Sequence, residues 1–331
     1  MRSRLHPWRP APYHGTEAVR PYFEGWYFKF VPKSKACPVA FIPGIFRGVC
    51  KEQDIGFIQV LYGKNDESRF IRYPPDAFSC PKDAFMLKVG NSSFSLGEVH
   101  VDIEDNGFCA RADLVCRDHT LLKTSLYSPS IMGPFSYLPG LQCSHGVLSL
   151  RQGVTGSLAI NGEAVDMDGA TGYIEKDWGR AFPRSWVWLQ GSGRSRTWGD
   201  ADCMCAAASV CLGPLRFTGL IAVIAVGGAQ YRFATYNGGR TAFLNAAENG
   251  VDIEVKKRGY RLAFSARAAG RGKILAPTPT GMNRDVYETL NATMSVTLLK
   301  RGRPLYSGVM EHCGMERSNA EALIKGAAPA P

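Results

Sequence analysis

The sequence predicts an all-β protein on three observations. Short segments rich in branched and aromatic residues recur along the chain, separated by glycine, proline, asparagine or aspartate. The 331 residues include 36 glycines and 20 prolines, which fits many turns between short strands. No amphipathic helix of three turns emerges before residue 130. Because runs of strands lie on both sides of residues 183–200, we expect two tandem β-barrel or sandwich domains with a cleft between them.

The first run of strands is expected to form a domain over residues 1–185. Its strands are predicted at residues 20–30, 38–46, 55–62, 69–73, 85–89, 94–103, 108–114, 121–126, 144–150 and 156–166. Turn signals lie between them, and Asn161–Gly162 suits a tight hairpin turn with positive φ.

The second run is expected to form a domain over residues 186–315. Its strands are predicted at residues 204–211, 215–226, 230–236, 242–244, 251–255, 260–266, 286–300 and 304–310, with a proline-rich loop at 276–281. Residues 316–331 are predicted to be a tail in which 315–325 could form a short helix and 326–331 are disordered.

Composition limits the partners. The formal charge of +10 suits an anionic surface, but the basic residues are scattered and no nucleic-acid-binding module is present. We therefore expect no nucleic-acid partner, and peripheral contact of a basic surface with phospholipid stays open. The apolar run at 217–226 is too short to span a bilayer, and residues 1–8 lack the apolar core of a signal peptide, so a cytoplasmic protein is expected. The oligomeric state is not indicated.

The ten cysteines follow no spacing typical of a metal or redox site. Cys203–Met204–Cys205 lacks the two-residue spacer of a zinc or redox pair. We expect reduced, mostly buried thiols.

Residues 172–191 hold the densest chemistry of the chain. On a strand, Tyr173, Glu175 and Asp177 project to one face, and Ile174, Lys176 and Trp178 project to the other. The two carboxylates lie about 7 Å apart, and on a buried face one of them would stay protonated. The alternative is that both acids pair with nearby basic residues and that the tryptophans only fill the core. Those basic residues are Lys176, Arg180 and Arg184.

Two further segments add to this group. Glu24 is predicted to share a strand face with Trp26 and Phe28, although it could also be a solvent-facing glutamate of an edge strand. The segment at 132–143 is rich in glycine, proline and apolar residues, and it is expected to be a loop that covers a cavity. It is also expected to lie beside His145, which could equally be a core histidine.

Several motifs, in this order, resemble the tocopherol cyclase family. They are Tyr22–Lys29, Gly133–Gly140, Cys143–Gly146, Glu175–Gly179, Phe182–Gln190, Tyr236–Gly238, Leu275–Thr278 and Arg284–Glu288. The resemblance implies paired lipocalin-like barrels, a fold shared with carotenoid hydratases. It also implies closure of a prenylated benzoquinol to a chromanol without a redox cofactor. Where plant members commonly have Asn, this chain has Asp177.

The chemistry of that reaction assigns roles to the candidate residues. A trisubstituted alkene is a very weak base, so it needs a neutral acid in a dry site, and the resulting cation needs aromatic faces. We expect Glu175 or Asp177 to donate the proton, with Glu24 as a third candidate. The remaining expected contacts with a hydrophobic substrate are Trp26, Trp178, Trp186 and Trp188 around the cation, His145 and Tyr137 at the phenol, and Tyr173 and Gln190.

No metal or other cofactor is invoked. Two alternatives remain open: hydration of an isoprenoid or carotenoid double bond, and non-catalytic binding of a lipid or prenylquinone.

Overall fold

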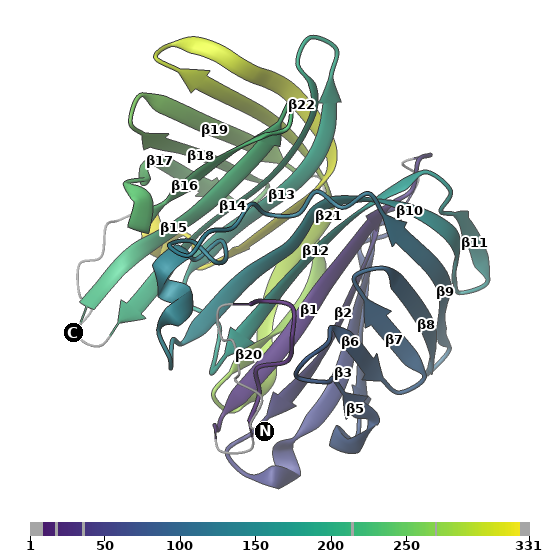
Figure 1. Cartoon of the computed structure of the whole chain (residues 1–331). Coiled ribbons are helices and arrows are strands. Elements are labelled where there is room, and N and C mark those ends of the chain that lie inside the picture. The colour runs from purple at the N-terminus through teal and green to yellow at the C-terminus, as the bar shows by residue number, and fades with distance from the viewer. Residues whose placement is uncertain (1–8, 17–18, 35–36, 213–214, 269, 325–331) are drawn as a thin grey trace. The chain divides into compact units, whose positions relative to one another are not determined.

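The computed structural model of the chain describes residues 9–16, 19–34, 37–212, 215–268 and 270–324. The chain forms two antiparallel sheets, one of twelve strands and one of ten, which confirms the all-β prediction (Figure 1). It divides into two compact units. Unit 1 comprises Met1–Phe182 and Ile274–Asp285, and unit 2 comprises Pro183–Lys273 and Val286–Pro331. The predictions for residues 1–8 and 326–331 lie outside the described residues.

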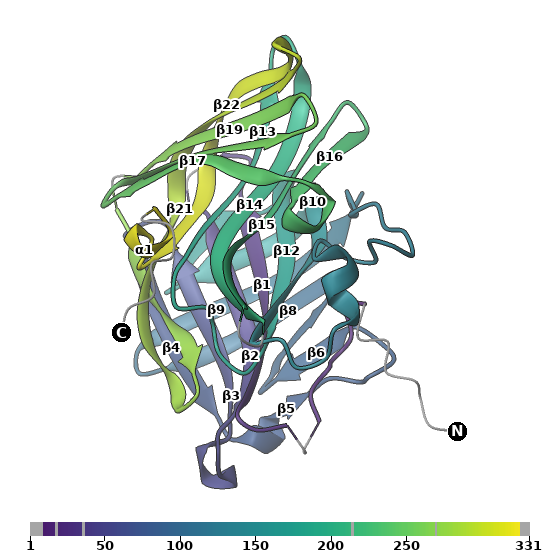
Figure 2. The ribbon, with the colours of Figure 1, turned by 90° about the vertical axis from the view of Figure 1, so that its left-hand side faces the viewer.

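Unit 1 holds the twelve-stranded sheet. Its strands are β1 (Tyr22–Val31), β2 (Val39–Arg47), β3 (Ile55–Tyr62), β4 (Glu67–Tyr73), β5 (Phe78–Ser79), β6 (Met86–Val89), β7 (Ser92–Ser95), β8 (Glu98–Asp105), β9 (Phe108–Arg117), β10 (Cys143–Ile160), β11 (Glu163–Asp166) and β12 (Ala170–Gly179). They are ordered β4-β3-β2-β1-β12-β10-β9-β8-β7-β6-β5, with β11 paired to β10. The first and last strands of this unit therefore lie side by side (Figures 1 and 2).

Tight turns connect neighbouring strands of this sheet. Asn106 and Gly107 between β8 and β9, and Asn161 and Gly162 between β10 and β11, all have positive φ, as a primed hairpin turn requires. The prediction of a strand at residues 121–126 is wrong. That segment is irregular, and it leads to the short 3-10 helix η3 (Gly133–Tyr137) before β10. Two further short helices, η1 (Lys51–Gln53) and η2 (Pro75–Ala77), join strands of unit 1.

The ten-stranded sheet is built from the later part of the chain. Its strands are β13 (Trp186–Ser195), β14 (Gly199–Leu212), β15 (Leu215–Val226), β16 (Ala229–Ala234), β17 (Arg240–Ala247), β18 (Gly250–Lys257), β19 (Tyr260–Arg267), β20 (Gly272–Thr278), β21 (Gly281–Lys300) and β22 (Arg303–Ser318). Their order is β16-β15-β14-β13-β22-β21-β19-β18-β17, with β20 paired to β21. The 3-10 helix η4 (Thr235–Asn237) ends at Gly238, whose φ is positive.

Two predictions for this region need correction. The segment expected to be a loop at 276–281 begins as the end of β20, so only its last residues turn. The helix expected at 315–325 shrinks to α1 (Glu321–Ile324), because β22 continues to Ser318 and pairs with β13. Strand pairing over these residues outweighs their helical pattern.

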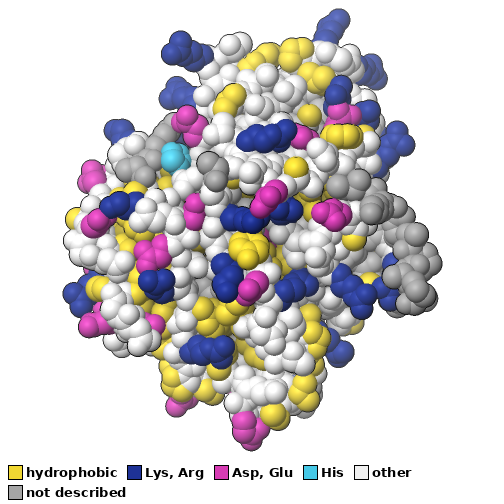
Figure 3. All heavy atoms as spheres, turned by 180° about the vertical axis from the view of Figure 1, so that it is seen from behind, with side chains coloured by type: hydrophobic (Ala, Val, Ile, Leu, Met, Phe, Trp, Pro, Cys, Tyr) yellow, Lys and Arg dark blue, Asp and Glu magenta, His cyan; other side chains and the backbone are white. Residues whose placement is uncertain are grey.

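Charged side chains are mixed on the surface that Figure 3 shows, where Lys and Arg are scattered among Asp and Glu. All ten cysteines are free thiols, and Cys116, Cys203, Cys205 and Cys313 are buried. Within the described residues, no helix has the length and apolar character that crossing a membrane would need.

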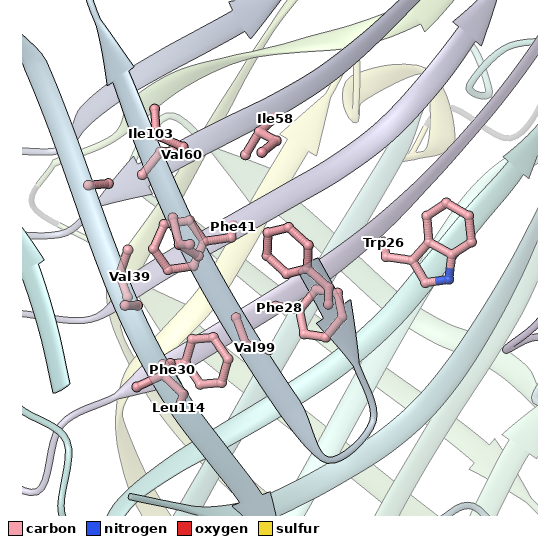
Figure 4. Close-up of a cluster of buried hydrophobic side chains, with 14 of the residues drawn as sticks. Trp26, Phe28, Phe30, Val39, Phe41, Ile58, Val60, Val99, Ile103 and Leu114 are labelled. Atoms are coloured by element: carbon pink, nitrogen blue, oxygen red, sulfur yellow. The ribbon is translucent and has the colours of Figure 1, made fainter. Parts of the chain in front are cut away.

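Each sheet encloses its own core. In unit 1, the core receives side chains from both halves of the sheet, including Phe28 of β1, Phe41 of β2, Val99 of β8 and Leu114 of β9 (Figure 4). In unit 2, Phe264 and other apolar side chains form a second cluster. The even-numbered side chains of β1 face the unit 1 core, which places Trp26, Phe28 and Phe30 inside as predicted.

Candidate functional site

Strand β12 carries charged side chains on both faces. It lies between β1 and β10, with Asp177 opposite Gly25 of β1 and His145 of β10. Ile174 belongs to the unit 1 core, and Lys176 points to the same face. The predicted alternation is therefore confirmed, and it separates two groups of polar residues.

The first group, which we call the acid–histidine cluster, consists of His145, Tyr173, Glu175 and Asp177. His145 Nδ1 donates to Asp177 Oδ1 over 2.9 Å, and His145 Nε2 lies 3.3 Å from Glu175 Oε2. The Tyr173 hydroxyl donates to Glu175 Oε2. Both imidazole nitrogens thus face a carboxylate, and the basic partners considered for the two acids are replaced by a histidine.

The cluster is mostly removed from water. Glu175 is only 5% exposed, whereas the side chains of His145 and Asp177 keep 13% and 25% of their exposure. Tyr27, opposite Glu175 in the register, packs edge-on against Tyr173 with ring centroids 6.4 Å apart. Asp177 is therefore the carboxylate that a substrate can approach.

The histidine of this cluster is a cation at neutral pH. Burial by itself disfavours the charged imidazole, but the carboxylates of Asp177 and Glu175 outweigh it and raise the pKa of His145 well above its ordinary value. An imidazolium between two carboxylates holds one mobile proton among three groups. That is a suitable arrangement for general acid–base chemistry.

The same three residues have the geometry of a possible metal site. One ligand atom from each of His145, Glu175 and Asp177 lies within 4.8 Å of the others. A metal ion needs a deprotonated nitrogen, so it would compete with the proton that the two carboxylates favour on His145. Either the protonated imidazole or a metal ion would balance the charge of the two acids.

The sheet surface next to Asp177 carries no side chains on two neighbouring strands. Gly25 lies opposite Asp177, and Gly44 of β2 lies opposite Gly25. A Cβ atom on Gly44 would come within 2.5 Å of Phe57 Cζ, so an aromatic ring lies directly on this glycine. Gly44 and Phe57 were not predicted as site residues, because their proximity to Asp177 depends on the register of β1, β2 and β3.

The second group lies on the other face of β12 and is fully buried. Lys176 and Glu24 form an ion pair, and neither side chain is exposed. Lys176 Nζ also donates to Pro12 O over 2.6 Å and to His14 Nδ1 over 2.8 Å. Glu24 further accepts hydrogen bonds from the Tyr22 hydroxyl and from the backbone N–H groups of residues 14 and 15.

This arrangement keeps Glu24 ionised. Burial would raise the pKa of its carboxyl, but Lys176 and the hydrogen bonds from His14 lower the pKa below its ordinary value. Burial and Lys176 lower the pKa of His14, so its ring is neutral, accepts at Nδ1 and donates from Nε2 to Arg9 O. The reading of Glu24 as an edge-strand residue near solvent is wrong, because β1 lies inside the sheet.

The four tryptophans expected around the cation lie on three different strands. Trp26 and Trp178 surround Lys176 Nζ, at 4.6 and 4.9 Å from their ring centroids, and so lie on the face opposite Glu175 and Asp177. The expectation that these two tryptophans line the same site as the acids of β12 is corrected. The two-residue period of the strand is the reason, since Trp178 and Asp177 are adjacent in sequence.

Trp186, Trp188 and Gln190 belong to β13 of unit 2. Trp186 Nε1 donates to Glu316 Oε1 over 2.8 Å, and the ring of Trp188 lies against Gly314. Glu316 pairs in register with both Trp188 and the buried Glu288. Neither glutamate was predicted as a site residue. The segment that contains Glu316 was expected to be a helix, whereas it is the end of β22.

Tyr137 belongs to the segment that precedes β10. It lies at the end of η3, where its hydroxyl donates to Leu126 O over 2.6 Å. The residue of this loop that reaches His145 is Met132, whose Sδ accepts from the His145 N–H over 3.0 Å. The loop therefore lies beside His145 as predicted, but through a methionine.

Comparison with known proteins gives a family and a fold. The family model described as tocopherol cyclase-like matches residues 124–319, more than half of the chain. No curated protein matches the sequence.

Three solved structures share the two-domain, lipocalin-like fold, which confirms the predicted fold class. CghA, solved with Sch210972, has a TM-score of 0.55 at 13% identity, with 94% of each chain covered. A Nitrosomonas europaea protein provisionally called AttH has a TM-score of 0.53 at 12% identity, over 92% of this chain and 94% of that one. Kievitone hydratase from Nectria haematococca has a TM-score of 0.50 at 10% identity, over 95% of this chain and 99% of that one. At these identities the likeness concerns the fold alone.

Proposed function

The chain belongs to the tocopherol cyclase-like family, and we propose that it is an enzyme that adds an O–H bond, from a phenol or from water, across an isoprenoid double bond by acid catalysis. The reaction we favour is closure of a prenylated benzoquinol to a chromanol. The observation that carries the proposal is the position of His145 between the carboxylates of Asp177 and Glu175.

The proton donor in this proposal is the pair of His145 and Asp177. The proton moves from Nδ1 to Oδ1 across the 2.9 Å hydrogen bond, and Asp177 delivers it to the less substituted alkene carbon. Exclusion of water by the substrate favours this transfer, because neutral imidazole and carboxylic acid are easier to desolvate than an ion pair. The π electrons form the new C–H bond and leave a tertiary cation.

The phenol oxygen then captures that cation. A C–O bond forms, and the phenolic proton passes to the Glu175 carboxylate, whose other partner is the Tyr173 hydroxyl. Transfer of this proton to His145 Nδ1 by way of the Asp177 carboxylate regenerates the imidazolium and both carboxylates, which is the starting state. No atom is gained or lost by the substrate, so the reaction is an isomerisation.

Glu24 has a structural role in this proposal rather than a catalytic one. Its low pKa and its ion pair with Lys176 leave no proton to donate at neutral pH. It also lies on the face of the sheet that points into the unit 1 core, away from Asp177.

Hydration of the same double bond is the second candidate. It is favoured by the fold likeness to kievitone hydratase and by the partial exposure of Asp177, which would admit water to the cation. The protonation step is identical in the two reactions, and only the oxygen that traps the cation differs.

Incubation of the purified protein with prenylated benzoquinols in D2O tests the proposal. Cyclisation gives a product that carries one carbon-bound deuterium and no added water, whereas hydration adds one water. Intact substrate that co-purifies with the protein, without conversion, would indicate a lipid-binding protein instead.

A further inference from the structure

The segment between β9 and β10 exposes apolar side chains in an unusual concentration. We call residues 121–138 the apolar loop. Among the described residues, its exposed large apolar side chains are Leu121, Leu126, Tyr127, Tyr137 and Leu138. Leu126 is 92% exposed and Tyr127 is 62% exposed, so both lie almost entirely in solvent. Exposed apolar groups that gather in one segment mark an interaction surface.

Hydrogen bonds within the loop hold this apolar tip in place. The backbone N–H and C=O groups of Ser125 and Ser128 bond to each other in both directions over 3.0 Å, which places Leu126 and Tyr127 at the end of a tight turn. The Tyr137 hydroxyl donates to Leu126 O, and Ser130 Oγ lies 2.5 Å from Ser136 Oγ. The exposure is therefore built into the loop, although it leaves apolar surface in water.

The charges around the tip fit a lipid surface. Residues 119–142 contain Lys123 and no aspartate or glutamate, in a chain whose formal charge is +10. A leucine beside a tyrosine is suited to the boundary between headgroups and acyl chains, because the ring is apolar while its hydroxyl stays hydrated.

We propose that the apolar loop docks the protein on a phospholipid bilayer, with Leu126 and Tyr127 inserted at the headgroup level. The same loop reaches the acid–histidine cluster, since Met132 Sδ accepts from the His145 N–H. Docking would thus place an entry point for an apolar substrate at the membrane. This last consequence rests on the proposed function, whereas the docking itself does not.

Vesicle sedimentation tests the docking without any substrate. The vesicles are phosphatidylcholine alone and phosphatidylcholine mixed with phosphatidylglycerol. We expect the wild type to bind both, more tightly when the anionic lipid is present, and the double variant Leu126→Ser, Tyr127→Ser to bind roughly tenfold more weakly or worse. Leu215→Ser removes an equally apolar and exposed side chain elsewhere, and it should bind like the wild type.

Three outcomes would overturn the docking. These are failure of the wild type to bind either vesicle, equal binding by the double variant, and equal weakening by Leu215→Ser. Analytical ultracentrifugation without lipid adds a fourth, because a dimer that the double variant dissociates would identify a second copy as the partner. Circular dichroism checks that each variant is folded. We expect all variants to fold, because the substituted side chains are exposed.

Activity assays separate this inference from the proposed function. A prenylated quinol dissolved in detergent should be converted equally by wild type and double variant, whereas conversion of the quinol embedded in vesicles should fall in the double variant. If neither protein converts any quinol but vesicle binding still depends on Leu126 and Tyr127, the docking stands and the proposed function fails. If vesicle binding is indifferent to these residues while detergent-dissolved quinol is converted, the reverse holds.

Discussion

A single histidine controls the charge of the candidate site. Without His145, Glu175 and Asp177 would be two carboxylates on one mostly buried strand face, an arrangement in which like charges oppose each other. With it, three groups share a proton that can move over a hydrogen bond of 2.9 Å. In the proposed reaction this proton stays in the new C–H bond of the product, and the phenolic proton replaces it at the site.

Removal of either partner of this hydrogen bond should slow the reaction without unfolding the protein. We expect Asp177→Asn and His145→Gln each to reduce kcat by roughly 10²–10⁴-fold, the range of general acid–base catalysis. Steady-state turnover of a prenylated quinol measures this loss. His100 and Asp113 form an exposed pair with a 2.7 Å contact, so His100→Gln and Asp113→Asn are matched controls that should retain full activity. Retained turnover in Asp177→Asn would move the donor to Glu175.

The raised pKa of His145 also sets a pH dependence. Since the active form is protonated, activity should persist through neutral pH and fall only as pH rises through the raised pKa. The linked stability has the same sign: it is fully present below the unfolded pKa of about 6.5 and is lost as pH rises through the folded value. Rate–pH profiles measure the effect on activity. NMR titration of the imidazole measures the pKa on which both effects depend.

The variant Asp177→Asn supplies the control for this pH dependence. It removes the nearer negative charge, so the imidazole should titrate at lower pH than in the wild type. An unchanged titration would mean that Asp177 does not hold the proton of His145.

At the scale of the element, strand β12 shows what alternation can and cannot predict. The sequence pattern correctly separated Tyr173, Glu175 and Asp177 from Lys176 and Trp178, because side chains of a strand alternate whatever its neighbours are. It could not identify the partners, since those depend on pairing between β12 and strands far away in the chain.

The pairing of β1 with β12 explains most of what was missed. It brings Glu24 beside Trp178 in the register and allows Lys176 to reach Glu24 across roughly 150 residues of sequence, a separation at which local pattern carries no information. The same limit explains the tail. The segment after Met315 has a helical pattern, but β13 offers Glu316 and Arg317 a strand to pair with.

The buried ion pair of Lys176 and Glu24 should be important for the stability of the fold. Lys176→Met leaves the Glu24 carboxylate charged and buried, which should lower the free energy of unfolding by roughly 3–5 kcal/mol. The double variant Glu24→Gln, Lys176→Met should recover part of that loss, because no charge then remains buried. Urea unfolding followed by tryptophan fluorescence provides the measurement.

An exposed pair in the same unit is the control. Lys64 and Glu163 also form an ion pair, but both side chains are about half in solvent, so Lys64→Met should cost far less than Lys176→Met. Equal losses for Lys64→Met and Lys176→Met would contradict the structural role of the buried pair.

At the scale of the whole molecule, the fold class was predictable and the division of the chain was less so. Short strands and frequent turns are local features, and they identified two successive all-β regions. The boundary is not simply sequential, however, because residues 274–285 belong to unit 1 although they form most of β20 and the start of β21, two strands of the other sheet. Packing decides this membership, and no local pattern indicates it.

One glutamine fastens that segment within unit 1. Gln59 is buried on β3, its Oε1 accepts from the Leu275 N–H over 2.7 Å, and its Nε2 donates to Leu275 O over 3.0 Å. Met282 of the same segment packs with Phe23, Phe46 and Phe57. The segment is therefore held by two hydrogen bonds to one side chain and by an apolar cluster.

Gln59→Ala should loosen this segment. Two partly buried backbone groups of Leu275 would lose their partner, so we expect a loss of at most roughly 1–3 kcal/mol for each group left unsatisfied. Hydrogen exchange should then become faster at the Leu275 amide, while amides in the unit 2 core around Phe264 keep their protection. Gln53→Ala is the control, because that exposed side chain accepts from the nearby backbone N–H groups of Val49 and Cys50. If the Leu275 amide kept its protection in Gln59→Ala, the apolar cluster around Met282 would be sufficient to hold the segment, and the two hydrogen bonds would only set its register.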